Sequence, residues 1–366
     1  MGFNEFFGNE RIASALRSML ARERVPHALL FAGPRGIGKY TLARLFAQAA
    51  NCERLKDDAC GECASCLRLA AMADPAPLIE RGLAERGESA DAAMVERTPL
   101  IVETHPDVWL LVPDPVRLRT PVARPLLRLG QLRAVQRAAH FAPSHRRRVF
   151  LLDGAETMRW TDAAAFLKIL EEPPESATLV LLTTNAEALL PTIRSRCLQF
   201  YFAPLAVEAV EQFLKDRTQL APAARRLSAQ LSGGCPGIAL SLDLPESERL
   251  RRDVLRFLET SVSGRDFSSL YALTSALSKN ERASFDNLLT MFYSVLSDLL
   301  VFTCGSRNPV LRNPDLRGEI ETLSAKVNRD WVARAVDHLD ELHGRLRRNS
   351  NRQLGLDAVA ASLSRP

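Results

Sequence analysis

The sequence predicts an α/β fold with a parallel sheet and flanking helices over residues 1–205, followed by an all-helical remainder. Two observations carry this prediction. Strand-like apolar runs alternate with helix-like stretches up to about Leu205, which is the pattern of a parallel sheet covered by helices on both faces. Beyond that point, almost every segment has apolar residues at helical spacing. The 366 residues are enough for two or three domains.

Each element of the first part is predicted from its local pattern. Continuous apolar runs indicate strands, and apolar residues three or four positions apart indicate helices. We expect strands at 28–32, 108–112, 149–152, 179–182 and 198–202, and helices at 10–22, 41–51, 129–139 and 162–171. The stretch 70–102 is rich in alanine, proline and charge, and we expect it to be an irregular surface insertion.

The second part divides into a small helical unit at 206–243 and a larger helical domain at 247–366. Pro204 and Leu205 mark the first boundary, and helices at 207–216 and 223–231 build the small unit. Residues 242–249, which include Pro245, are expected to be a linker. In the larger domain, Leu288, Phe292 and neighbouring residues at helical spacing form an apolar stripe.

Composition indicates a cytoplasmic globular protein. Hydrophobic residues make up 46% of the chain and charged residues 25%, which is ordinary for a soluble domain. No apolar run approaches membrane-spanning length, and the N-terminus lacks the pattern of a signal peptide. In a cytoplasmic protein, clustered cysteines bind metal more often than they form disulfides.

Positive charge is concentrated between Arg117 and Arg148. This stretch holds nine arginines and no acidic residue, in a chain with a net charge of +5. Such a stretch can meet the phosphates of nucleic acid or an acidic patch on a partner protein. A solvated helix face with a basic loop explains it equally well, so the sequence leaves these alternatives open.

A phosphate-binding loop is predicted after the first strand. The segment Gly33-Pro-Arg-Gly-Ile-Gly-Lys-Tyr-Thr41 has the glycines and the lysine of a P-loop, in the strand–turn–helix context that the motif needs. Lys39 would place its ammonium against the β- and γ-phosphates. The alternative is a glycine-rich turn with an exposed lysine. The predicted nucleotide-binding residues are Gly33, Gly36, Gly38, Lys39 and Thr41, with Asp153 at the end of a later apolar strand.

The same site lacks two groups that ATP hydrolysis needs. Tyr40 stands where a P-loop has the serine or threonine that meets magnesium, and Thr41 comes one residue too late. Gly154 follows Asp153 at the place of the glutamate that would activate water. Binding of ATP or ADP stays open, but hydrolysis is not expected. An active ATPase would need another acid, such as Glu156 two residues further on.

Four cysteines predict a structural zinc site. Cys52, Cys60, Cys63 and Cys66 lie within fifteen residues, and their two Cys-x2-Cys steps suit one tetrahedral zinc ion held by thiolates. A closed four-thiolate site has no open position for a substrate, so the ion would be structural. The alternative is a group of four ordinary buried cysteines.

One arginine is a candidate arginine finger. Arg196 lies in the connector Leu190-Pro-Thr-Ile-Arg-Ser-Arg-Cys197 between two expected strands. A finger places its planar cation at the γ-phosphate bound by a neighbouring subunit, where it offsets the charge of the transition state. Taken alone, these residues favour the alternative of an ordinary surface charge.

Together, these segments resemble the clamp-loader branch of the AAA+ proteins. The resemblance is densest in the first 200 residues, and the run into Glu-Glu-Pro-Pro is specific to that branch. The helical remainder resembles the family only in its length and its helical pattern. The segments that carry the resemblance are Pro26-His-Ala-Leu-Leu-Phe-Ala-Gly-Pro34, the four cysteines, His105-Pro-Asp-Val108, Leu167-Lys-Ile-Leu-Glu-Glu-Pro-Pro174 and Ser195-Arg-Cys197.

The resemblance implies an AAA+ P-loop core with an inserted zinc module at about 50–70, a small helical lid at 206–243 and a C-terminal helical collar at 247–366. Proteins of this family load the ring-shaped sliding clamp onto primed DNA as part of the bacterial DNA polymerase III holoenzyme. Their motor subunits hydrolyse ATP. Their stator subunits have decayed nucleotide motifs and keep the Ser-Arg-Cys arginine for the ATP site of a neighbour.

This chain has the stator pattern. The resemblance therefore implies no ATPase activity of the chain alone, and a role of Arg196 in trans. Gly237 stands where motor subunits have a sensor arginine. The implied partners are the motor subunits and the clamp-opening delta subunit, with the sliding clamp and primed DNA reached through the complex. The alternative is an active motor subunit of the same complex.

Overall fold

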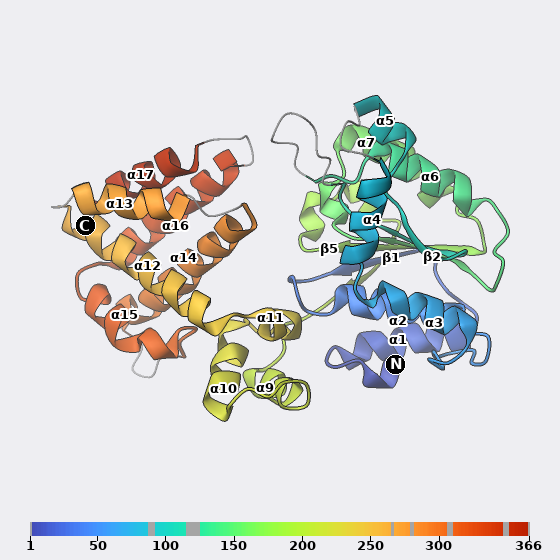
Figure 1. Ribbon diagram of the computed structural model, residues 1–366, viewed down its shortest axis with the longest axis horizontal. Helices are drawn as coiled ribbons and strands as arrows, with labels where there is room; N and C mark the ends of the chain where they lie inside the picture. Colours follow the sequence, from blue (N-terminus) through green and yellow to red (C-terminus); the bar gives the residue numbers. More distant parts are fainter. Residues whose placement is uncertain are drawn as a thin grey trace. The chain divides into compact units, whose positions relative to one another are not determined.

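The computed structural model describes residues 2–86, 92–114, 125–264, 267–278, 282–305, 310–346 and 351–364. The chain folds into two compact units, which we describe separately (Figure 1). The first unit contains Met1–Leu205 and Cys235–Ile238, and the second contains Ala206–Gly234 and Ala239–Pro366. The division of the second part into a lid and a collar stays a prediction.

A six-stranded sheet forms the centre of the first unit. The strand order is β2-β3-β4-β5-β1-β6, and every neighbouring pair is parallel except β2 and β3. The register sets Ala32 beside Thr183 and Leu152 beside Leu181, so the carboxyl ends of β1, β4 and β5 meet at one edge. Open parallel sheets bind ligands at this edge. The strands are β1 (Ala28–Ala32), β2 (Val102–His105), β3 (Val108–Leu111), β4 (Arg148–Leu152), β5 (Ala177–Thr183) and β6 (Leu198–Tyr201).

Helices cover both faces of this sheet, as the sequence predicts. They are α1 (Glu10–Ala21), α2 (Lys39–Ala50), α3 (Ala64–Ala70), α4 (Ala76–Arg86), α5 (Ala92–Arg97), α6 (Leu129–Ala139), α7 (Trp160–Glu171) and α8 (Pro191–Arg194). Every residue of β1 and β5 is buried. Side chains alternate between two cores: Leu29 and Phe31 pack with α1 and α2, whereas Leu30 packs with α6 and α7.

The stretch 70–102 is more regular than the sequence predicts. It contains the short 3-10 helix η2 (Ala71–Ala73), α4 and α5, and its end enters β2, a strand that pairs antiparallel with β3. Arg86 at the end of α4 makes a buried ion pair with Asp114, with Nη1 2.7 Å from Oδ2. Glu96 of α5 accepts a hydrogen bond from the backbone N–H of Gly130 in α6. These contacts join residues distant in sequence, so no local pattern indicates them.

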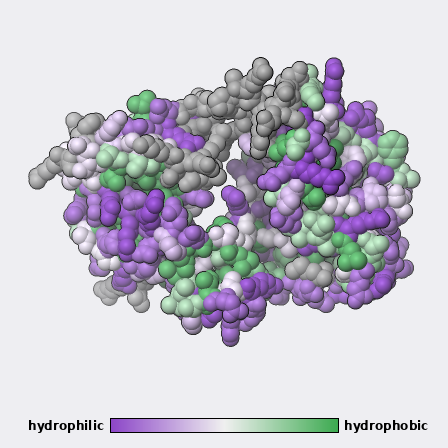
Figure 2. Space-filling model, in the orientation of Figure 1, coloured by the Kyte–Doolittle hydropathy of each residue, from purple (hydrophilic) through white to green (hydrophobic). Residues whose placement is uncertain are grey.

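Every secondary-structure element described in the second unit is a helix. One apolar core includes Leu288 and Phe292, whose stripe the sequence predicts, together with the buried Trp331. On the face shown in Figure 2, hydrophobic and hydrophilic residues are interspersed. No described helix is long and apolar enough to cross a membrane. The helices are α9 (Val207–Lys215), α10 (Pro222–Leu231), α11 (Pro236–Ser241), α12 (Leu244–Ser263), α13 (Phe267–Ser278), α14 (Arg282–Thr303), α15 (Arg317–Ser324), α16 (Arg329–Leu346) and α17 (Arg352–Leu363); the first residues of α11 belong to the first unit.

The expectation of a linker at 242–249 is wrong for most of that stretch, because α12 begins at Leu244. Asp243 caps this helix by accepting a hydrogen bond from the backbone N–H of Glu246 at 3.1 Å. Pro245 fits the first helical turn, where its missing N–H leaves no bond unmade. The proline therefore belongs to a helix start rather than to a break.

Candidate nucleotide and metal sites

The P-loop joins β1 to α2 at the carboxyl edge of the sheet. Gly36 and Gly38 have φ of +75° and +102°, a region that favours glycine. Gly38 directly precedes α2, so the loop runs into a helix N-terminus. Backbone N–H groups at such a terminus are a favourable place for phosphate. The strand, turn and helix that the motif requires are all present.

Lys39 is folded over this loop. Its Nζ donates hydrogen bonds to the carbonyls of Gly33 and Pro34 at 2.7 and 2.8 Å. An ammonium has three donors, so one remains for a phosphate oxygen. Burial lowers the pKa of Lys39, and the nearby Asp153 opposes this shift. Burial in turn raises the pKa of Asp153, which follows the end of β4.

The side chain of Tyr40 is bonded to another segment of the chain rather than to the P-loop. Its hydroxyl donates a hydrogen bond to the carbonyl of Met72 in η2, and its ring packs against the core of the first unit. Burial raises the pKa of Tyr40, which keeps the hydroxyl neutral. Thr41 follows on α2, about 100° further around the helix, and is half-buried. Position 40 therefore supplies no short hydroxyl to the P-loop.

The position after Asp153 is shaped for glycine. Gly154 has a φ of +65°, and a Cβ there would lie 2.8 Å from Cγ of Pro113. The next acid along the chain after Asp153, Glu156, is bound by Thr184. Its Oε1 accepts hydrogen bonds from the backbone N–H of Thr184 at 3.1 Å and from the hydroxyl at 2.5 Å. This contact holds the carboxylate against the end of β5.

Residues 235–238 close against the P-loop. The backbone N–H of Gly237 donates a hydrogen bond to the carbonyl of Gly36 at 2.8 Å. A Cβ at Gly237 would lie 2.9 Å from that oxygen and 3.1 Å from Cα of Gly36. No side chain fits at position 237 without a shift of the backbone, so packing disfavours a sensor arginine at this place.

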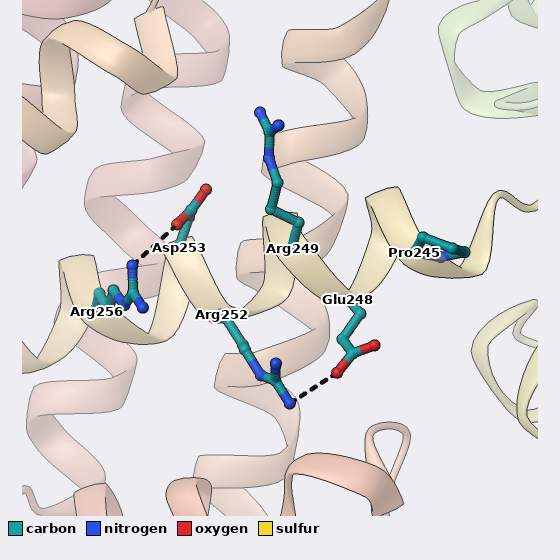
Figure 3. Close-up of a pocket in the computed structure, with 6 residues that line it drawn as sticks. All are labelled: Pro245, Glu248, Arg249, Arg252, Asp253 and Arg256. Carbon is teal, nitrogen blue, oxygen red and sulfur yellow. Dashed lines mark ion pairs between the residues drawn. The ribbon is translucent and has the colours of Figure 1, made fainter.

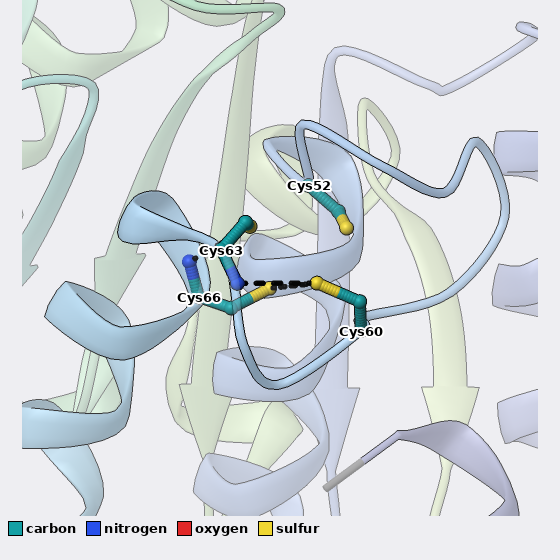
Figure 4. Close-up of side chains that lie close together, drawn as sticks. All are labelled: Cys52, Cys60, Cys63 and Cys66. Carbon is teal, nitrogen blue, oxygen red and sulfur yellow. Dashed lines mark hydrogen bonds between the residues drawn. The ribbon is translucent and has the colours of Figure 1, made fainter.

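The four cysteines converge between α2 and α3 (Figure 4). Their sulfur atoms all lie within 4.8 Å of one another, so the group can hold a metal ion. The backbone N–H of Leu55 points at Cys52 Sγ and that of Cys63 at Cys60 Sγ, each at 3.3 Å. Backbone hydrogen bonds from Glu62 and Cys63 lower the pKa of Cys60 to about 6, which favours the thiolate that a metal binds. These donors fit zinc.

A buried polar cluster, which the sequence analysis missed, ties this cysteine module to the sheet. His105 Nε2 lies 2.9 Å from Ser65 Oγ, and its Nδ1 accepts a hydrogen bond from the N–H of Asp107 at 3.1 Å. The Asp107 carboxylate accepts from the backbone N–H of Ser144 at 2.7 Å and from Nδ1 of His145 at 2.9 Å. Because Nδ1 of His105 accepts, its proton lies on Nε2 and is donated to Ser65.

This polar cluster is better explained as a brace than as a second metal site. His105, Asp107 and His145 have ligand atoms within 4.8 Å of one another. Each of these atoms already takes part in a hydrogen bond, as described above. Burial lowers the pKa of His105 to about 4, which keeps the ring neutral. The His105-Pro-Asp107 motif was the signal in the sequence, but its partners Ser65 and His145 lie far from it along the chain.

Arg196 lies at the other edge of the sheet, just before β6 begins. Its Nη2 is 3.0 Å from Oε1 of Glu171, and its Nη1 donates a hydrogen bond to the carbonyl of Thr192 at 3.0 Å. About a third of the side chain, 36%, is exposed. Since β6 runs parallel to β1, this edge is opposite the P-loop. The guanidinium is therefore placed away from the nucleotide site of its own chain.

The basic stretch contains arginines of two kinds. Arg146 donates a hydrogen bond to the carbonyl of Leu55 and Arg147 to the hydroxyl of Thr178, each at 3.0 Å. Arg133 and Arg137 are instead exposed on α6, four residues apart, and make no ion pair within the described part of the chain. Arg117, Arg119 and Arg124 lie outside the described residues.

A surface depression of about 310 Å³ lies along α12 (Figure 3). Arg252 Nη2 is 2.7 Å from Oε1 of Glu248, and Arg256 Nη1 is 3.8 Å from Oδ1 of Asp253. These arginines are thus paired with acids of their own helix, and the depression indicates no ligand. It is lined by Pro245, Glu248, Arg249, Arg252, Asp253 and Arg256.

Comparison with known proteins decides the family. Residues 8–206 match the family described as DNA polymerase III, delta subunit, and this match covers more than half of the chain. This chain belongs to that family. Residues 246–361 match the family described as DNA polymerase III, delta subunit, C terminal. The resemblance to clamp-loader AAA+ subunits is thereby confirmed at the level of the family.

Relatives of this delta-family chain include other DNA polymerase III subunits. The tau subunit of Escherichia coli (strain K12) is 30% identical over 247 residues, which are 66% of this chain and 32% of tau. The tau subunit of Bacillus subtilis (strain 168) is 26% identical over 296 residues, which are 79% of this chain and 45% of that protein. The match thus spans only 32% and 45% of the length of these two relatives.

Matches among solved structures include a RuvB mutant from Thermotoga maritima. It is 16% identical, with a TM-score of 0.41, and the match covers 88% of this chain and 84% of RuvB. A DNA polymerase III gamma subunit-related protein from the same organism is 15% identical, with a TM-score of 0.35 and coverage of 95% and 98%. Likenesses at these scores carry no functional argument.

Proposed function

We propose that this chain is the stator, or delta-prime, subunit of the DNA polymerase III clamp loader, which helps to load the sliding clamp onto primed DNA. The chain hydrolyses no ATP itself and supplies Arg196 as an arginine finger to a neighbouring ATPase subunit. The observation that carries the proposal is the contrast between two edges of one sheet. The P-loop edge keeps Lys39 but lacks a metal hydroxyl and a base, whereas Arg196 is partly exposed at the opposite edge.

At its own P-loop, the chain keeps the groups that hold phosphate and lacks those that cleave it. The N–H groups at the start of α2 and the ammonium of Lys39 would contact the phosphates of ATP or ADP. Tyr40 is bonded to Met72 instead of facing the loop. A nucleotide in this site would be held without turnover.

The alternative, an active motor subunit, has less support from the geometry. It requires an acid that can activate water beside the phosphates. Gly154 offers none, and Glu156 is bonded to Thr184. The contact of Gly237 with Gly36 also leaves no room for a sensor arginine.

The other parts of the proposal concern metal, location and partners. Cys52, Cys60, Cys63 and Cys66 would hold one structural zinc ion, which would cross-link the end of α2 to α3. Partners would be the motor subunits and the clamp-opening delta subunit, joined through a collar at 247–366. The complex would act in the cytoplasm on the clamp and primed DNA.

The experiment compares ATP turnover by the isolated chain with turnover by the assembled clamp loader. The isolated chain, with magnesium and primed DNA, should be no faster than its Lys39→Ala variant. In the assembled complex, Arg196→Ala should lower turnover by about 10³-fold, as expected for a lost arginine finger. Turnover by the isolated chain that Lys39→Ala abolishes would instead establish a motor subunit.

A second candidate function is contact with DNA through α6. The observation that favours it is the exposed pair Arg133 and Arg137, which make no ion pair with any described acidic residue, followed by the exposed Phe141. In the double variant Arg133→Ala/Arg137→Ala, the plot of the logarithm of the DNA association constant against the logarithm of salt concentration should be less steep by about two. Arg11→Ala, at another exposed arginine, is the control. Equal slopes for the double variant and the control would leave α6 for protein contacts.

A further inference from the structure

We propose that Glu171 is a positioning residue for the arginine finger. Its carboxylate holds the guanidinium of Arg196 at the edge of the subunit. The guanidinium then leaves the carboxylate and binds the γ-phosphate of the nucleotide in the neighbouring subunit. This inference rests on the proposed function of Arg196. It gives a role to the Glu-Glu-Pro-Pro motif, which the fold and the P-loop do not explain.

Two contacts fix the guanidinium, one on each terminal nitrogen. Nη2 lies 3.0 Å from Oε1 of Glu171, and Nη1 donates a hydrogen bond to the carbonyl of Thr192 at 3.0 Å. The other arginine of this turn, Arg194, is bonded to Glu187. Glu171 is therefore matched to the finger rather than shared between the two arginines.

The two segments that carry this ion pair are anchored in the same buried apolar core. Leu170, next to Glu171, and Ile193, three residues before Arg196, are 2% and 1% exposed in one apolar cluster. α7 ends at Glu171, and Pro173 and Pro174 prevent its continuation. The position of the carboxylate is thus set by a helix end that the sequence fixes.

The carboxylate lies where a helix alone would disfavour it. Glu171 is the last residue of α7, and a negative charge at a helix C-terminus opposes the helix dipole. A cation at that position is favourable, and Arg196 supplies it. The ion pair therefore offsets the unfavourable charge of Glu171 and places the arginine at the end of α7.

The pair is also weak enough to be exchanged. The side chains of Arg196 and Glu171 are 36% and 52% exposed, and exposed ion pairs contribute little. A γ-phosphate has more charge and more acceptor oxygens than one carboxylate, so it competes well for the guanidinium. Holding the long side chain near its working position beforehand reduces the entropy lost when it docks.

The test measures ATP turnover by the complete clamp loader assembled with variants of this chain. Glu171→Ala should lower kcat about two- to fivefold, the range given by an exposed ion pair, and leave the KM for ATP unchanged. The loss should shrink as ionic strength rises. Glu171→Gln keeps an acceptor oxygen, so its kcat should lie between those of Glu171→Ala and the wild type. Glu172→Ala removes the next exposed carboxylate, which has no contact with Arg196, and should have no effect.

A double variant separates positioning from a structural role. If Glu171 acts through the finger, Glu171→Ala should cause no further loss in a chain that already carries Arg196→Ala. An equal loss in both backgrounds, or no difference from Glu172→Ala, overturns the inference alone. Unchanged turnover with Arg196→Ala overturns the proposed function and the inference together. Should Glu171→Ala fail to assemble, Glu171→Gln carries the same comparison.

Discussion

The hydroxyl of Tyr40 donates a hydrogen bond to the carbonyl of Met72, and this bond joins the P-loop helix to the inserted segment. Tyr40 occupies the position where a nucleotide hydrolase has its magnesium-binding hydroxyl. Here the same position fastens η2 to α2. The loss of a catalytic group and the attachment of the insertion thus depend on one side chain.

Tyr40→Phe should destabilise the first unit without creating ATPase activity. The ring stays in place, but the Met72 carbonyl loses its donor, so the free energy of unfolding should fall by about 1 kcal/mol. Urea denaturation measures the change. Tyr201→Phe is the matched control, because Tyr201 is exposed and its hydroxyl bonds to the side chain of Gln199, two residues away. Equal changes for the two variants would contradict the role assigned to Tyr40.

The cysteine module should contain one zinc ion per chain. Cys66 is fully buried among the four thiols, so Cys66→Ser should reduce the metal content and lower the unfolding midpoint. Metal analysis of the purified protein and thermal unfolding with and without a chelator provide the measurements. Cys304→Ser, at an exposed cysteine outside the cluster, should change neither quantity. A protein with no bound metal and an unchanged midpoint in chelator would refute the site.

Local patterns predicted the parts of the fold that depend on neighbours in sequence. The helix over 129–139 matches α6 because its apolar residues keep one period throughout. The strand β2 was missed, since its four residues are stabilised by pairing with β3. The linker expected around Pro245 was wrong, because the cap made by Asp243 decides how that proline is used.

The candidate sites show the same limit. The spacing of the cysteines was enough to predict that their thiols converge, and the P-loop motif was enough to predict its strand and helix. The partners of single side chains were not predictable. Nothing near Tyr40 indicates Met72, and nothing near His105 indicates Ser65, because tertiary packing chooses these partners.

The stability of the chain should fall between pH 6.5 and pH 4 because of His105. Burial lowers the pKa of this ring to about 4 in the folded chain, whereas an unfolded histidine titrates near 6.5. Between these values the unfolded state binds a proton that the folded state does not, so lowering the pH favours unfolding. Below about pH 4 the ring is protonated in both states, so the loss of stability caused by His105 has reached its full size and grows no further.

The measurement is urea denaturation at pH 7 and at pH 5 for the wild type and for His105→Asn. The variant should be less stable at pH 7 and should lose less stability on going to pH 5. The carboxylate of Asp107 does not obscure this comparison. Burial alone would raise its pKa, but hydrogen bonds from the N–H of Ser144 and from His145 outweigh that effect and lower the pKa below its usual range. The same loss in both proteins would show that His105 is not the titrating group.

Restoring the missing glutamate should not restore hydrolysis. In Gly154→Glu, the new side chain must adopt a φ of +65°, and its Cβ meets Pro113 at 2.8 Å. The left-handed backbone alone costs about 1–2 kcal/mol for a residue with a Cβ. Gly233→Glu provides the control, since that glycine has a φ of +60° with no atom within 4 Å of its Cβ position. Any destabilisation of Gly154→Glu beyond that of Gly233→Glu therefore measures the contact with Pro113.

The ATPase rate of Gly154→Glu should stay at background, because Tyr40 still supplies no metal ligand. Turnover above that of a Gly154→Glu/Lys39→Ala double variant would mean that the glutamate alone was missing.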